Sequence, residues 1–187
     1  GLSAALVAAA FASAQTTLPV PASHLSQEGT GSTNVPFGRS TPTRVQYAYD
    51  GALFSAPVTI TAVAFRLDGG ATAASKTVDC ELRLSTLPVP LLGFGSDFAS
   101  NRGPNETVVL PRQMLTLPGG GATAVPNGFL PPIALATPFP YDPAAGLLVL
   151  EIVVHGQPPG GYLLDMTYVC DSPDVAIGPP SCSGTNG

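Results

Sequence analysis

The sequence predicts an all-β protein, built as an antiparallel β-sandwich or a jelly roll, and three observations support this fold class. The 187 residues include 21 glycines and 21 prolines, residues that break helices and occur at turns. Several segments alternate apolar and polar residues with the period of two expected for a strand with one buried face. The chain is 44% hydrophobic, so it can bury a core despite its turn-rich composition.

Residues 1–14 have the pattern of a secretory signal peptide. An apolar run, Leu2–Phe11, leads into Ala12-Ser13-Ala14, the small-x-small motif that a signal peptidase cuts, which would make Gln15 the new N-terminus. The alternative is an Ala-rich hydrophobic helix, and the run is shorter than the ~20 apolar residues that span a bilayer. No Met or basic segment precedes it, which suggests a signal clipped at its start. We therefore expect a secreted or cell-surface protein with no membrane span in its mature part.

The rest of the chain divides into three parts. Residues 15–42 are polar and turn-rich, which predicts an extended leader that could contribute one edge strand. Residues 43–170 carry the strand patterns and suit a single β-sandwich domain. Residues 171–187 have the composition of a linker followed by the start of another domain.

Two strands are expected first, Thr43–Tyr49 and Val58–Leu67. Both are rich in the β-branched and aromatic residues that favour a pleated sheet. In the second strand, Arg66 would point outward. The inward side chains would be Val45, Tyr47, Tyr49, Val63, Phe65 and Leu67.

The clearest strand is Thr77–Ser85, in which apolar residues alternate strictly with polar ones. One set would face the core and the other would face water. The inward set is Val78, Cys80, Leu82 and Leu84, and the outward set is Asp79, Glu81, Arg83 and Ser85. Two short candidates follow, Thr107–Leu110 and Gln113–Leu117, separated by Pro111.

The last two predicted strands are Leu147–Val154 and Tyr162–Val169. The first is almost continuously apolar, as expected of a central strand buried on both faces. Glu151 interrupts it, and a buried carboxylate is costly unless it is paired, so Glu151 should face water or an arginine. Gly- and Pro-rich turns separate all these strands, and no long segment after the signal has helical periodicity.

The charge distribution argues against binding to nucleic acid or to anionic membranes. The formal net charge is −5, Lys76 is the only lysine, and the six arginines are scattered along the chain. Phosphates and anionic lipids are bound by clustered Lys and Arg side chains. We therefore expect neither kind of partner.

Three cysteines, Cys80, Cys170 and Cys182, fit an oxidising compartment but leave one thiol unpaired. A Cys80–Cys170 disulfide would join two strands, and a Cys170–Cys182 disulfide would close a local loop. The sequence leaves both pairings open, and a partner beyond Cys182 would explain the odd number. No Cys or His spacing indicates a zinc site.

Few residues suggest catalysis. His24 lies in the polar leader, where a solvated side chain is the simpler interpretation. His155, at the end of an apolar strand, could supply part of a Ser-His-Asp triad with Asp142 or Asp165. No GxSxG elbow or other nucleophile motif accompanies these residues.

A glycosidase would need two carboxyl groups facing each other across a cleft, and Glu81 and Glu151 are the best candidates for such a pair. Glu81 alternates outward with Asp79 and Arg83, so a solvated, ion-paired face is the simpler interpretation. Sugar sites often use aromatic side chains, but the chain has no tryptophan. Its tyrosines already fit core or turn positions: Tyr47, Tyr49, Tyr141, Tyr162 and Tyr168.

The loop Gly93–Glu106 is the most distinctive irregular segment. Its side chains could hold a structural calcium ion, for which oxygen ligands are needed: the candidates are Asp97, Asn101, Asn105 and Glu106. Their spacing is not that of an EF-hand, and a plain surface loop is the alternative. Asn105 also begins an N-glycosylation sequon. No other cofactor is expected.

Several segments together carry a resemblance: RVQYAYDGALF, VTITAVAFRLDG, CELRLSTLP, FASNRGPNETVVL and TPFPYDPAAGLLVLEI, within about residues 43–154. In this succession the chain resembles a family of secreted proteins of unassigned function from planctomycete-like and other environmental bacteria, which often carry C-terminal cell-surface sorting signals. Leu147 departs from the family pattern, in which Asn is common at this position. The resemblance implies a jelly-roll-like extracellular module and no known catalytic residues.

Two functional hypotheses follow. The favoured one is a non-enzymatic extracellular β-sandwich, a surface-structural or adhesive module of a larger exported protein, with extracellular polysaccharide or other surface proteins as partners. The alternative is a carbohydrate-binding accessory domain of a secreted hydrolase, and a hydrolase in its own right comes third.

Overall fold

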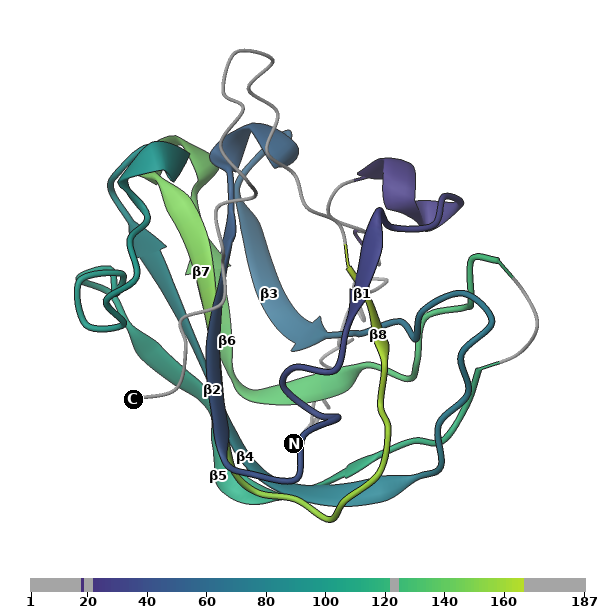
Figure 1. The fold of residues 1–187 in the computed structure, drawn as a ribbon. Helices are drawn as coiled ribbons and strands as arrows, with labels where there is room; N and C mark the ends of the chain where they lie inside the picture. The colour runs from purple at the N-terminus through teal and green to yellow at the C-terminus, as the bar shows by residue number, and fades with distance from the viewer. Residues whose placement is uncertain (1–17, 19–21, 122–124, 167–187) are drawn as a thin grey trace, which may run out of the picture.

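The structure is a computed structural model that describes residue 18 and residues 22–121 and 125–166 (Figure 1). Within these residues the regular structure is β-strand, and the helices are single 3₁₀ turns of three or four residues. The elements in chain order are η1 (Ala22–Leu25), β1 (Gly31–Thr33), β2 (Thr43–Tyr49), η2 (Gly51–Leu53), β3 (Val58–Val63), β4 (Lys76–Leu87), η3 (Leu91–Gly93), β5 (Thr107–Leu117), β6 (Ile133–Tyr141), η4 (Pro143–Ala145), β7 (Leu147–Gly156) and β8 (Leu164–Met166). The all-β prediction is confirmed.

The largest sheet is antiparallel and has the strand order β2-β7-β4-β5. The β7 strand lies between β2 and β4, so Ile152 has Val45 as its neighbour on one side and Leu82 on the other. This position explains why Leu147–Val154 is almost continuously apolar, because a central strand packs on both of its faces. The predicted central strand is therefore confirmed.

The β4 strand confirms the inward half of the clearest prediction, whereas Ser85, predicted to face water, is buried. Val78, Cys80, Leu82 and Leu84 are all buried, and they alternate with polar residues as expected. The strand continues to Leu87, beyond the predicted end, and there both faces are covered. The reason is that the loop before β5 packs over its outer face.

The β5 strand corrects the prediction of two short strands. Pro111 lies inside a single strand from Thr107 to Leu117. Two features accommodate it. Among the described strands β5 pairs only with β4, and the register shifts between Cys80 and Leu82, opposite the proline. Proline cannot donate to a sheet ladder, so within sheets it occurs at edges and bulges.

The β3 and β6 strands form a second, two-stranded antiparallel sheet. The β6 strand was not predicted from the sequence, because Pro138 and Pro140 obscure its pattern. Each strand of a two-stranded sheet has one edge without a partner strand, and proline is tolerated at such an edge. The β3 strand also ends at Val63, earlier than the predicted Leu67.

The prediction that Arg66 points outward is wrong. Arg66 is only 5% exposed, and it lies in an isolated bridge opposite Phe129. The chain has left the regular alternation after Val63, so the period of two no longer sets the direction of this side chain. An ion pair with Asp165 compensates the buried charge.

The leader contributes to the core. The β1 strand pairs antiparallel with β8, so Gly31–Thr33 lies beside Leu164–Met166 (Figure 1). Phe37 is completely buried and packs edge-on against Phe65 and Tyr162, with ring centroids 5.4 and 6.2 Å away. The remainder of the predicted strand Tyr162–Val169 lies outside the described residues.

One core joins the sheets. Side chains from the four-stranded sheet, such as Leu82 and Ile152, belong to the same buried cluster as Phe139 and Tyr141 of β6 and Leu164 of β8. This arrangement of antiparallel sheets is consistent with a β-sandwich, whereas the jelly-roll order stays a prediction. Among the described residues, no helix has the length and apolar character needed to cross a membrane.

Candidate functional site

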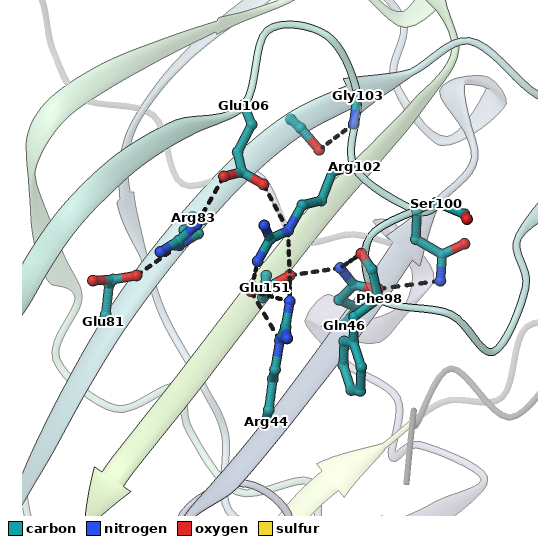
Figure 2. A network of polar contacts seen from close by, with 12 residues as sticks. Arg44, Gln46, Glu81, Arg83, Phe98, Ser100, Arg102, Gly103, Glu106 and Glu151 are labelled. Atoms are coloured by element: carbon teal, nitrogen blue, oxygen red, sulfur yellow. Dashed lines mark hydrogen bonds and ion pairs between the residues drawn. The ribbon is translucent and has the colours of Figure 1, made fainter. Parts of the chain in front are cut away.

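The candidate site lies on the face of the four-stranded sheet that is turned away from the main core. In the register of the sheet, Glu151 of β7 stands opposite Gln46 of β2 on one side and Arg83 of β4 on the other. Side chains that are directly opposite share a face of the sheet. Arg44 and Glu81, two residues along their strands, therefore join the same face. The loop between η3 and β5 covers it (Figure 2).

Glu151 is the centre of this site, and its side chain is only 4% exposed. Arg44 donates from Nε to Oε1 at 3.1 Å and from a terminal nitrogen to Oε2 at 3.2 Å. Arg102 donates to the same two oxygens at 2.9 and 3.3 Å, and Gln46 Nε2 donates to Oε2 at 2.6 Å. The carboxylate therefore accepts from two guanidinium groups and one amide.

The ionic contacts extend from Glu151 to two further carboxylates. Arg102 also forms an ion pair with Glu106 at 2.8 Å. Glu106 accepts from Arg83 at 2.8 Å, and Arg83 in turn donates to Glu81 at 2.6 Å. Figure 2 shows this continuous chain of contacts across the sheet. We call the connected residues the Glu151 network: Arg44, Gln46, Glu81, Arg83, Asn101, Arg102, Glu106 and Glu151.

Asn101 ties the covering loop to this network. Its Nδ2 donates to Gln46 Oε1 at 3.1 Å and to the Gly95 carbonyl at 2.7 Å, while its Oδ1 accepts from the Gly95 amide. Gln46 also donates to the Phe98 carbonyl at 3.0 Å. The Phe98 ring lies 4.3 Å from the Arg44 guanidinium, a cation–π contact.

The loop approaches the sheet closely just before β5. A Cβ added to Gly103 would lie 1.8 Å from the Thr86 carbonyl oxygen, so only glycine fits. The Gly103 amide donates to Ser85 Oγ, and Asn105 both accepts from the Thr86 amide at 2.7 Å and donates to its hydroxyl. These contacts explain why the end of β4 is buried on both faces.

The electrostatics of the network favour the charged forms of Glu151, Arg83 and Arg102, since the pKa of Glu151 is lowered and those of the two arginines are raised. Burial alone would raise the pKa of Glu151, but hydrogen bonds from Arg102, Arg44 and Gln46 outweigh it and hold the pKa below its ordinary value. For Arg83, hydrogen bonds to carboxylates likewise outweigh burial, and its pKa is raised. A general acid at neutral pH needs a raised carboxyl pKa, so Glu151 has the opposite property.

The four predicted calcium ligands each form hydrogen bonds or ion pairs with a different part of the protein. Asp97 accepts from the Ser100 amide at 2.8 Å and from its hydroxyl at 2.6 Å, and these bonds lower the Asp97 pKa. Asn101 contacts Gln46, as described above, while the other two candidates, Asn105 and Glu106, contact Thr86 and two arginines. Calcium binding at this loop stays a prediction.

The catalytic candidates are distributed over several elements. Glu81 and Glu151 are connected through arginines and Glu106. Asp142 accepts from the Ala144 amide at η4, and Asp165 is paired with Arg66, so neither forms a described contact with His155. In the leader, the His24 carbonyl accepts from Arg66 at 2.8 Å.

The tyrosines and the described cysteine lie mainly in the interior. Tyr141 and Tyr162 are fully buried, with hydroxyls that donate to backbone carbonyls, and Tyr47 donates to the Val35 carbonyl. Tyr49 is half-buried, and Tyr168 lies outside the described residues.

Cys80 is buried and forms no disulfide among the described residues, and burial raises the pKa of its thiol to about 11. Cys170 and Cys182 lie outside the described residues, so the disulfide pairing stays a prediction.

Glu151 was predicted to face water or an arginine, and it is buried beside Arg44 and Arg102. The sequence did not predict which arginines and which amide these partners are. Arg44 and Gln46 lie two residues apart in the predicted strand Thr43–Tyr49, so the sequence does indicate that they share a face of that strand. Arg102 lies in the loop, where no periodic pattern indicates its position. Comparison of the chain with protein-family models, with curated proteins and with solved structures found no match.

Proposed function

We propose that this chain is a non-enzymatic extracellular β-sandwich, a surface-structural or adhesive module of a larger exported protein. The observation that carries the proposal is the Glu151 network. Its three carboxylates are held by three guanidinium groups in contacts that fasten the covering loop to the sheet. Such contacts stabilise a rigid surface, and they occupy the acids that a glycosidase would use.

A hollow lined by apolar side chains, including Phe37, Phe65, Leu130 and Ile133, also supports a structural role. Its volume is about 10 Å³, which is room for about one water molecule. Pockets for small ligands are usually larger, roughly 300–1,000 Å³, and carry convergent polar groups. The small volume and apolar lining of this hollow are more typical of imperfect packing between the leader and the sheets than of a substrate pocket.

The extracellular placement rests on the sequence. The small-x-small motif at residues 12–14 after an apolar run motivates it. The partners that fit an acidic surface module with few lysines are extracellular polysaccharides or other surface proteins. The resemblance to secreted bacterial proteins of unassigned function points the same way.

The test begins with export and binding. In a bacterial host, we expect the secreted chain to start at Gln15 by mass spectrometry. A secreted species that retains Leu2–Phe11 would contradict the predicted signal-peptide cleavage. The purified chain is then applied to a glycan array and to immobilised cell-surface fractions. Binding to surface fractions without hydrolysis supports the module, and selective glycan binding would favour a carbohydrate-binding domain instead.

The decisive experiment is an assay for hydrolysis. The wild-type chain and the variants Glu81→Gln, Glu151→Gln and His155→Ala are assayed on polysaccharide and ester substrates, with circular dichroism as the control for folding. We expect no turnover by any of them. Turnover that is lost in one variant with the fold preserved would overturn the non-enzymatic proposal.

A further inference from the structure

The segment before β6 carries an Asn-Gly pair, Asn127-Gly128, that is held against a turn from another part of the chain. Asn127 is only 4% exposed. Its Nδ2 donates to the Asp68 carbonyl at 2.7 Å and to the Ala71 carbonyl at 3.2 Å. The carboxamide of Asn127 therefore serves as a donor to two backbone oxygens.

The turn that receives these hydrogen bonds is itself tied to the rest of the fold. The Ala71 amide donates to the Asp68 carbonyl at 2.9 Å, which closes the turn. The Asp68 amide donates to the Leu163 carbonyl at 3.0 Å, just before β8. The Asn127 side chain thus connects the segment before β6 to a turn that is anchored elsewhere.

Gly128 supplies a nucleophile next to this side chain. The peptide nitrogen that follows an asparagine can attack the side-chain carbonyl carbon, and glycine allows this attack because it has no Cβ in the way. Gly128 is exposed, and among the described residues its amide donates no hydrogen bond. Its φ lies outside the left-handed region, and an added Cβ would meet no atom within 4 Å. The fold itself therefore does not require glycine here.

We propose that Asn127 is a site of spontaneous deamidation, and that release of its side chain from the Asp68 and Ala71 carbonyls controls the rate. The Gly128 nitrogen loses its proton and forms a bond to Asn127 Cγ, while the bond from Cγ to Nδ2 breaks and this nitrogen leaves as ammonia. Water then opens the resulting succinimide at either carbonyl, which gives aspartate or isoaspartate. No atom changes its oxidation state, and water is the co-reactant.

The folded structure opposes the reaction until this segment opens. Ring closure requires the Asn127 side chain to turn toward the Gly128 nitrogen, and that rotation breaks its hydrogen bonds to the two carbonyls. Segments of a folded protein open locally at a lower free energy than the whole protein unfolds. The reaction therefore proceeds from a minor, locally open state, and its product accumulates with the age of the chain.

The product no longer fits the position of Asn127. An aspartate carboxylate has no N–H to donate, and it would face two carbonyl oxygens in a buried place, which is unfavourable. Isoaspartate would also lengthen the backbone just before Phe129, which stands opposite Arg66 in an isolated bridge. Deamidation should therefore loosen the segment before β6 from the turn at Asp68.

The experiment follows deamidation of the full chain at mildly alkaline pH by peptide mapping and mass spectrometry, in a folded sample and in a urea-unfolded one. We expect deamidation at Asn127 in both samples, and at least about tenfold faster in urea, because the open state is a minor part of the folded population. Fragmentation distinguishes Asn127 from the other Asn-Gly pair, Asn186-Gly187, which lies outside the described residues. Asn34 is exposed and precedes the β-branched Val35, so it is the internal control and should stay intact.

The variants separate the chemistry from its structural effect. Gly128→Ala keeps the Asn127 side chain but places a Cβ beside the attacking nitrogen, so it should slow deamidation in both samples and change the melting temperature by less than about 2 °C. Asn127→Asp imitates the product and should lower the melting temperature by roughly 4–12 °C. Asn34→Asp is the matched control, because it adds the same charge at an exposed position and should change the melting temperature by less than about 2 °C.

Three results would overturn the proposal. They are an Asn127 that stays intact in the folded chain over several weeks, equal rates in the folded and urea-unfolded samples, or equal rates in the wild type and Gly128→Ala. Equal melting temperatures for Asn127→Asp and Asn34→Asp would overturn the expected loosening. If Asn127→Asp does not fold, the deamidated wild-type chain, separated by ion exchange, gives the same comparison.

Discussion

Replacing Glu151 with glutamine removes the charge at the centre of the network while keeping the shape of the side chain. In the native chain this carboxylate accepts hydrogen bonds from Arg44, Arg102 and Gln46. A glutamine would present one acceptor oxygen, and its amide group would bring N–H donors toward guanidinium groups that also donate. Among the described residues, the substitution therefore leaves Arg44 without its ion-pair partner and leaves Arg102 paired with Glu106 alone.

The expected loss of stability follows from burial. Removing one partner of a buried ion pair costs about 3–5 kcal/mol. The lower end applies to Glu151→Gln, because the side chains of Arg44 and Arg102 are 35% and 31% exposed and water can solvate them. A loss of about 3 kcal/mol corresponds to a fall in Tm of roughly 6–12 °C for a chain of this size.

The assay is urea unfolding followed by circular dichroism, with wild type and variant at the same pH and salt concentration. Asp79→Asn is the control, because Asp79 forms an ion pair with the exposed Arg112, and exposed pairs contribute little to stability. We expect a large shift in the urea midpoint for Glu151→Gln and a small one for Asp79→Asn. Equal shifts in the two variants would refute the idea that the Glu151 network fastens the loop to the sheet.

Three further outcomes are expected. Leu82→Asp should lower the free energy of unfolding by more than about 4 kcal/mol, because it buries an unpaired charge. Arg83→Asp should lower it by about 1–3 kcal/mol, because it places a third carboxylate beside Glu81 and Glu106. Similar losses for the two variants in urea melts would mean that the assignment of inward and outward faces in β4 is wrong. Gly103→Ala should lower the urea midpoint strongly, because a Cβ meets the Thr86 carbonyl oxygen; an unchanged midpoint would contradict the close approach. The stabilisation from ionised Glu151, whose pKa is lowered, should be complete above its ordinary pKa of 4.5 and lost as the pH falls through the lower folded-state value. Urea melts between pH 7 and pH 3 should therefore show a smaller acid-induced loss for Glu151→Gln than for wild type, and parallel pH curves would contradict this.

The strands that could be predicted are those whose alternation reports burial directly. In β4 every second residue from Val78 to Leu84 packs into the core, so the pattern of the sequence and the pattern of burial coincide. The central position of β7 was also predictable, because its apolar run leaves no solvated face. In both strands the local sequence carries the information.

The parts that could not be predicted depend on distant residues. Arg66 is buried because Asp165, from the other end of the domain, meets it, and no local pattern encodes that contact. The β6 strand was hidden by prolines that only its open edge tolerates. The Glu151 network needed the strand order β2-β7-β4, since only the register brings Gln46 and Arg83 beside Glu151.

The balance of charge explains how the Glu151 network holds the loop to the sheet. In the Glu151 network three carboxylates form ion pairs with three guanidinium groups, so the formal charges of the network cancel. These ion pairs connect the loop to the sheet. Replacing Glu151 with glutamine would leave an excess of positive charge in the network, so this variant should be less stable than the wild type.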